Sequence, residues 1–67
     1  MERINVNSSN ISSIGFEDGV LEIEFRNGAV YQYYDVQEHI FDDLMQADSH
    51  GKYLAQNIKG YFRYSRV

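Results

Sequence analysis

The C-terminal stretch from residue 49 to residue 67 alternates cationic and aromatic side chains and contains no acidic residue. Proteins that bind single-stranded nucleic acids combine cations, which contact phosphates, with rings, on which bases stack. This composition predicts a nucleic-acid-binding segment with RNA as the expected ligand. The residues expected to contact it are Lys52, Lys59, Tyr61, Arg63, Tyr64 and Arg66. The structural alternative is that Tyr61, Phe62 and Tyr64 close the core while the arginines face water or a protein partner.

A second candidate lies at the segment Ser49-His50-Gly51-Lys52, which we expect at the start of a helix. Helix N-termini offer free amides and the positive end of a dipole, and both suit phosphate. Gly51 would let the backbone approach a ligand closely, and Lys52 would add charge. The alternative is an ordinary interhelical turn, in which Ser49 caps the helix and the other polar side chains are solvated.

Catalytic and metal chemistry find little support in the sequence. There is no Cys, which excludes disulfides and thiolate zinc sites, and the two histidines, His39 and His50, do not have a metal-ligand spacing. No nucleophile-elbow, phosphate-loop or dinucleotide-binding motif is present. We therefore expect a binding domain that is not an enzyme and that carries no cofactor and no metal.

Charge is distributed unevenly along the chain. Residues 1–48 carry all ten acids against two arginines, a balance of −8, whereas residues 49–67 carry +4, which gives −4 overall. The basic tail would either neutralise an acidic face or form a local anion-binding patch. No stretch resembles a membrane span or a signal peptide, and the absence of Cys fits a reducing cytoplasm, so we expect a cytoplasmic protein.

The elements that would position these residues form one α+β domain of 67 residues. Alternation of apolar and charged residues from Leu21 to Arg26 indicates a half-buried strand, and Asn27-Gly28 is a strong hairpin signal. We predict a three-stranded antiparallel meander at residues 11–17, 20–26 and 29–34. A helix at residues 36–47 and a shorter one at residues 50–58 would pack on it. The β-prone residues 61–64 could add a strand to one sheet edge.

The length of the hairpin loop decides where Tyr31 and Tyr33 point. A two-residue loop pairs Arg26 with Ala29 and leaves both rings on the wet face. A three-residue loop, with Gly28 in the left-handed conformation, pairs Phe25 with Ala29 and buries them, because a slip of one residue reverses a strand's faces. We expect the three-residue loop, since a domain this small needs the buried area of two large rings.

Four residues are predicted to define the helix ends. Asp35 would cap the first helix, with Glu38 as the reciprocal acid of a capping box. Ser49 would cap the second helix, and Gly60 would stop it.

Five segments carry a recognisable pattern: Val6 to Ile11, Leu21-x-Ile23-x-Phe25-x-x-Gly28, Tyr31-Gln32-Tyr33, Ala47 to Tyr53 and Ile58 to Tyr61. Their order and spacing resemble the KTSC domain family, a short domain named for its occurrence at the C-terminus of some lysyl-tRNA synthetases and also found alone in small bacterial and phage proteins. Gln37 and Phe62 stand where the family pattern has Pro. The resemblance implies a compact strand-and-helix module with Tyr31 and Tyr33 as a Tyr-x-Tyr motif, and it brings no catalytic residues. RNA binding is suggested by the synthetase context.

Two further functions remain open. Surplus rings in a small domain would also suit a protein-interaction module, either a phage-type inhibitor or a homodimer. A third function is sequestration of a small anionic ligand at Ser49–Lys52.

Overall fold

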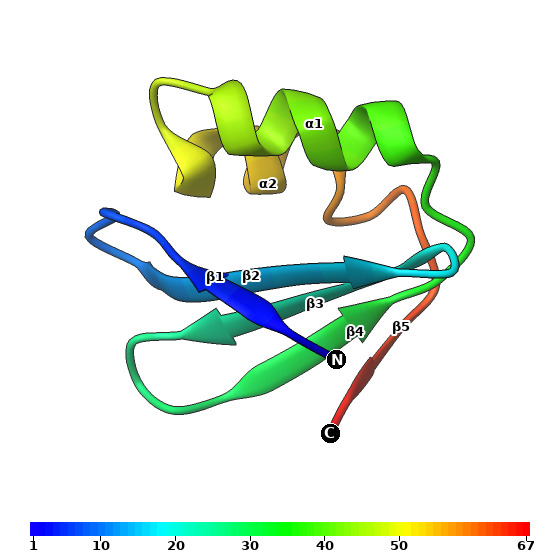
Figure 1. Ribbon diagram of the computed structural model, residues 1–67, viewed down its shortest axis with the longest axis horizontal. Coiled ribbons are helices and arrows are strands. Elements are labelled where there is room, and N and C mark those ends of the chain that lie inside the picture. The colour runs from blue at the N-terminus through cyan, green and yellow to red at the C-terminus, as the bar shows by residue number, and fades with distance from the viewer.

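The computed structural model describes residues 1–67 as a five-stranded antiparallel sheet with two helices on one of its faces (Figure 1). The strands lie in chain order across the sheet, so each pairs with its neighbours in sequence. The strands are β1 (Arg3–Asn5), β2 (Ile11–Glu17), β3 (Val20–Phe25), β4 (Val30–Tyr33) and β5 (Tyr64–Arg66). The helices are α1 (Glu38–Gln46) and α2 (His50–Asn57). No helix is long and apolar enough to cross a membrane.

The predicted meander is confirmed as strands β2 to β4, and the hairpin has the three-residue loop. Phe25 and Ala29 are joined by a backbone hydrogen bond of 2.8 Å from the Phe25 N–H, and Gly28 has a φ of 92°. The Asn27 side-chain oxygen accepts the Ala29 N–H at 3.0 Å and fixes the turn. Tyr31 therefore pairs with Ile23, and Tyr33 pairs with Leu21.

The three-strand prediction was incomplete at both edges of the sheet. β1, which pairs with β2, was not predicted, because its three residues are all exposed and leave no apolar alternation to detect. An edge strand does form at the C-terminus. It begins at Tyr64 rather than at Tyr61, since the preceding residues turn away from α2.

The predicted start of the first helix was wrong. The N-cap is Gln37, it makes no side-chain capping bond, and Glu38 is the first helical residue. Asp35 has a φ of 58°, a left-handed conformation, and its carboxylate binds Arg63 instead of the helix amides. The chain therefore turns at Asp35, and α1 spans residues 38–46 rather than 36–47.

The predicted start of the second helix is confirmed, and the helix ends at Asn57, one residue before the predicted end. The Ser49 hydroxyl accepts the Lys52 N–H at 3.2 Å, which makes Ser49 the N-cap of α2. Gly60 has a φ of 85° and turns the chain from α2 towards β5.

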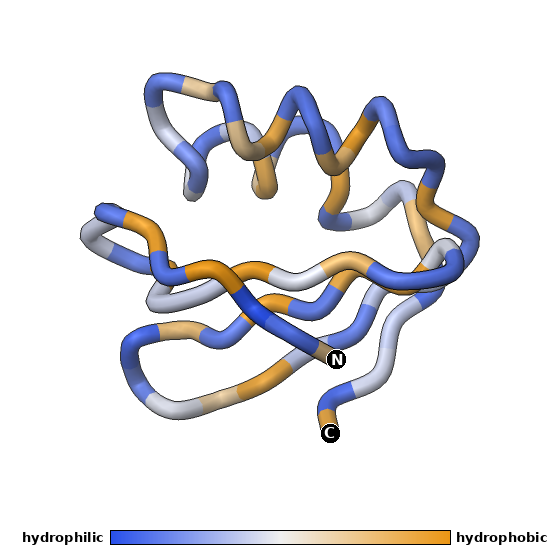
Figure 2. Tube along the Cα trace, in the orientation of Figure 1, coloured by the Kyte–Doolittle hydropathy of each residue, from blue (hydrophilic) through white to orange (hydrophobic).

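The core lies between the sheet and the helices, where apolar segments of both layers face one another (Figure 2). Each helix contributes one side chain that is nearly or fully buried, Leu44 from α1 and Leu54 from α2. Half-buried side chains such as Ile40 and Phe41 surround this centre, and Phe41 stacks on Phe16 with ring centroids 5.1 Å apart. The buried cluster comprises Ile11, Ile14, Leu21, Ile23, Tyr33, Val36, Leu44, Leu54 and Ile58.

The opposite face of the sheet carries a polar network centred on Glu22. Arg3 Nη1 lies 2.7 Å from Glu22 Oε2, and the Gln32 amide donates to Glu22 Oε1 at 2.8 Å. These two partners, the Gln32 amide first, hold the pKa of Glu22 below its usual value of 4.5. Arg3 also lies 3.7 Å from Glu24, so β1 is joined to β3 across β2.

Replacing Arg3 with alanine is expected to lower the free energy of unfolding by about 1 kcal/mol at neutral pH, because Glu22 loses a charged partner. A carboxylate with a lowered pKa contributes stability above the pKa of the unfolded chain and loses it as pH falls through the folded-state pKa. The difference between wild type and Arg3→Ala should therefore shrink towards about pH 3. Urea unfolding at neutral pH and at about pH 3 measures this difference in the free energy of unfolding. A difference that persists unchanged at low pH would contradict the role of the Arg3–Glu22 ion pair.

Candidate functional site

A groove of about 690 Å³ lies where β5 extends the sheet beyond β4. Four aromatic rings, two cations and two asparagines line it together with two small residues, and none of the ten acids in the chain does. The groove therefore carries only positive formal charge, whereas the whole chain has a net charge of −4. The lining residues are Phe25, Tyr31, Tyr33, Tyr64, Lys59, Arg66, Asn10, Asn27, Ala29 and Gly60.

The pairing of β4 with β5 brings two of the predicted site residues to this groove. Tyr33 pairs with Tyr64 and Tyr31 pairs with Arg66, and directly paired residues share one face of a sheet. The Tyr64 ring centroid lies 5.9 Å from the centroids of both other tyrosine rings. Tyr33 is only 3% exposed and belongs to the core, whereas Tyr64 is 61% exposed. Tyr64 therefore leaves a ring surface available to a ligand.

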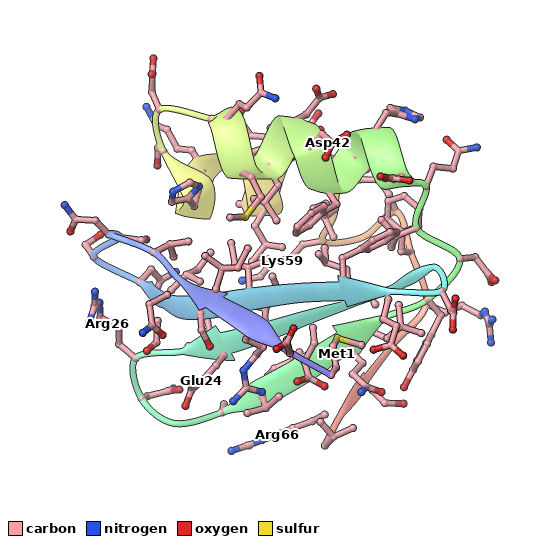
Figure 3. All side chains as sticks on the ribbon, viewed as in Figure 1. Met1, Glu24, Arg26, Asp42, Lys59 and Arg66 are labelled. Carbon is pink, nitrogen blue, oxygen red and sulfur yellow. The ribbon has the colours of Figure 1, made fainter.

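Lys59 reaches the groove from the other layer of the molecule. Its backbone N–H bonds to the Leu54 carbonyl at 2.9 Å, which fixes it at the end of α2. Its ammonium lies 5.5 Å from the centroid of the Phe25 ring, and that ring meets Tyr31 edge-on with centroids 5.7 Å apart. The two groove cations, Lys59 and Arg66, both labelled in Figure 3, thus come from the segment after α2 and from the C-terminal strand.

A second, shallower hollow of about 610 Å³ adjoins the groove, and Gly60 and Tyr64 line both. Tyr61, which is 72% exposed, is one of its walls. Arg63 is another, and its Nη2 lies 2.7 Å from Asp35 Oδ2 while its guanidinium carbon lies 5.7 Å from the centroid of the Tyr34 ring. The hydrogen bond to Asp35 holds the pKa of the Arg63 guanidinium above its usual value.

The structure brings together only part of the predicted binding segment. Lys59, Tyr64 and Arg66 line the groove, and Tyr61 and Arg63 line the adjoining hollow. The exposed Lys52 lines neither. The residues of the predicted basic segment thus lie in two adjacent depressions, except for Lys52, which lies outside both.

The predicted anion site at the start of α2 is built largely from groups that already have intramolecular partners. The Ser49 hydroxyl accepts the Lys52 N–H, and His50 Nδ1 lies 2.8 Å from the Leu44 carbonyl oxygen. A β-carbon added at Gly51 would make only ordinary contacts with Asn10, so this glycine does not mark a cramped backbone approach. No residue of the segment from Ser49 to Lys52 lines either depression.

Several lining residues were not predicted as site residues. Tyr31 was expected in the core, yet it is half-buried and forms part of the groove floor. Asn10 and Asn27 are both exposed at the groove, on loops that the sequence indicates only as turns.

No three His, Asp or Glu side chains gather into a cluster that could hold a metal ion.

The fold and the groove define a small α+β domain in which two short edge strands enlarge a meander covered by helices on one face. The KTSC domain model matches residues 7–62, and the chain belongs to this family. A crystal structure of a KTSC domain protein from Yersinia pestis superposes with a TM-score of 0.95 at 40% identity, covering 98% of this chain and 96% of that one.

The chain is similar in sequence to two kinds of protein, small single-domain proteins and lysine–tRNA ligases. An uncharacterised protein of Stutzerimonas stutzeri is 37% identical over 70 residues, covering 100% of this chain and 99% of that protein. The lysine–tRNA ligase of Nostoc punctiforme is 38% identical over 47 residues, which is 70% of this chain but 8% of the ligase. The domain thus occurs both as a small protein and within a much larger synthetase.

Proposed function

We propose that this protein is a non-enzymatic, cytoplasmic module that binds single-stranded RNA in the groove between β4, β5 and the end of α2. The observation that carries the proposal is the exposed Tyr64 ring in a groove that holds Lys59 and Arg66 and no acid. A ring offers a stacking surface to a base, and flanking cations offer contacts to phosphates. The groove volume lies within the range of ordinary small-ligand sites, so it suits one or two nucleotides rather than a long duplex.

The distribution of charge supports this choice of site. The negative total charge opposes strong nonspecific attraction to a polyanion. Binding would therefore depend on a local patch where acids are absent, and the groove is such a patch. The family also occurs in enzymes whose names include tRNA, which favours RNA as the polymer.

Titration of a short labelled single-stranded RNA by fluorescence anisotropy tests the proposal. Binding should be measurable at ~50 mM salt, and with two phosphate contacts the logarithm of the affinity should fall with the logarithm of salt at a slope of about −1.4. No binding at ~50 mM salt, or binding without salt dependence, would refute the proposal.

Neutralising the groove cations is expected to weaken this binding. Lys59→Gln and Arg66→Gln should each lower the affinity about three- to fivefold and flatten the salt slope by about 0.7, because each removes one phosphate contact. Lys52→Gln is the matched control, since Lys52 is an exposed lysine outside the groove. Equal losses in all three variants would indicate a general effect of net charge and would contradict a groove-specific site.

The free edge of β5 favours one second candidate, self-association. The Arg63 carbonyl accepts the N–H of Tyr34, which follows β4, and the Val67 N–H donates to Val30. The alternation of an antiparallel ladder therefore turns the N–H and C=O groups of Tyr64 and Arg66 away from β4. These groups could pair with β5 of a second copy. Sedimentation at high protein concentration tests it, and a strict monomer would exclude such a dimer.

A further inference from the structure

The pair formed by Arg63 and Asp35 is the only ion pair that the basic tail makes, and it is almost fully solvated. The two side chains are 76% and 79% exposed, although their charged atoms lie 2.7 Å apart. Exposed pairs of this kind add little to stability. The fold already holds the two strands together at this point, because the Tyr34 N–H bonds to the Arg63 carbonyl at 2.9 Å. The Asp35 carboxylate therefore adds little to the stability that the backbone hydrogen bond already provides at this point.

Two contacts orient the Arg63 guanidinium, and one of them is with an anion. It lies over the Tyr34 ring on one side, and its Nη2 points at the Asp35 carboxylate. A guanidinium presents the same planar fork of donors to a carboxylate and to a phosphate. The Asp35 carboxylate thus occupies a position that a phosphate group would occupy if the acid moved aside.

The location of this pair connects it with the groove. Arg63 lines the adjoining hollow, and Gly60 and Tyr64 line both depressions. A strand that stacks one base on Tyr64 would continue across this shared boundary towards Arg63. We propose, on the basis of the RNA-binding function above, that Arg63 is a further phosphate contact of the bound strand and that Asp35 is a built-in competitor, which the RNA phosphate displaces.

The backbone at Asp35 makes the proposal easy to test. Asp35 has a φ of 58°, and asparagine adopts this left-handed conformation as readily as aspartate does. Asp35→Asn therefore removes the charge while it keeps the turn and the size of the side chain. Asp42→Asn is the matched control, because it removes one exposed acid from α1, a helix that lines neither depression (Figure 3).

Asp35→Asn is expected to bind single-stranded RNA about two- to fivefold more tightly than wild type at ~50 mM salt and to steepen the salt slope by up to about 0.7. Arg63→Gln should weaken binding, and adding Asp35→Asn to Arg63→Gln should produce no further tightening beyond that of Asp42→Asn. This non-additivity distinguishes competition at Arg63 from a change in net charge. Anisotropy titrations of the four variants and wild type supply every value, and thermal unfolding checks that each is folded.

Two results would overturn the inference while leaving the groove intact. One is an equal gain from Asp35→Asn and Asp42→Asn, and the other is a gain from Asp35→Asn that persists in full when Arg63 is absent. If the wild type binds no RNA at all, the proposed function itself fails. Binding by wild type with either of the first two results rejects only the role of Asp35 and Arg63.

Discussion

Replacing Tyr64 with leucine is expected to weaken binding of single-stranded RNA by about tenfold, which is the largest effect that we predict for a single groove residue. Stacking of one base on an aromatic ring contributes about 1–3 kcal/mol, and leucine keeps apolar bulk while it removes the ring face. Tyr64 is the groove ring with the most exposed surface, so it is the one available for stacking. Anisotropy titration at fixed salt measures the loss.

Tyr64→Phe is the matched control for this experiment. It keeps the ring and removes only the hydroxyl, so we expect binding within about twofold of wild type. Because Tyr64 contacts Tyr31 and Tyr33, both variants need a check of thermal stability before the affinities are compared. Equal affinities of Tyr64→Leu and Tyr64→Phe would show that this ring does not stack on the ligand.

Replacing Leu44 with alanine is expected to have the largest effect on stability, a loss of about 3 kcal/mol. Leu44 is the only fully buried side chain of α1, and the cavity left in its place would lie between that helix and the sheet. A domain of this size has a net stability of roughly 3–5 kcal/mol, so the variant should be partly unfolded at physiological temperature. Thermal unfolding followed by circular dichroism should show a midpoint lowered by more than about 10 °C.

Leu44→Met is the control for the core, because methionine has nearly the same volume and should cost less than about 1.5 kcal/mol. If Leu44→Ala were as stable as Leu44→Met, α1 would not be attached to the sheet through this side chain. Both variants retain every groove residue. Any folded fraction should therefore keep its affinity for RNA.

Local patterns in the sequence predict the centre of the fold well. The alternation around Leu21 and Ile23 and the Asn27-Gly28 turn define the β3–β4 hairpin, and the need to bury Tyr33 selects its register. The Ser49 cap and the Gly60 turn follow from local chemistry and are confirmed. These signals are strong because neighbouring residues decide the outcome.

The edges of the fold depend on contacts between distant residues and were harder to predict. β1 is held by backbone pairing and by Arg3, whose partner Glu22 lies 19 residues away in the sequence. Asp35 has the sequence of a helix cap, but its carboxylate meets Arg63, 28 residues further along the chain. The tertiary contact therefore replaces the local one, and the helix begins without a side-chain cap.

The candidate site, like the fold, could be predicted from the sequence only in part. The basic and aromatic composition after residue 48 points to Lys59, Tyr64 and Arg66, all of which line the groove. Composition alone could not separate them from Lys52, because the pairing of β5 with β4 places Arg66 in the groove and the end of α2 places Lys59 there. It could not include Tyr31 either, since that ring becomes a groove residue only where β5 extends the sheet beyond it.

The most direct test of RNA binding in the groove is a nuclear magnetic resonance titration of the ¹⁵N-labelled protein with a short single-stranded RNA. The account predicts that amide shifts concentrate on the groove and its boundary, at Tyr31, Lys59, Gly60, Tyr64 and Arg66. Amides of α1 and β1 should change little, because neither element contributes a groove residue. Shifts centred on α1, on β1 or on the start of α2, or no shifts at low salt, would contradict it.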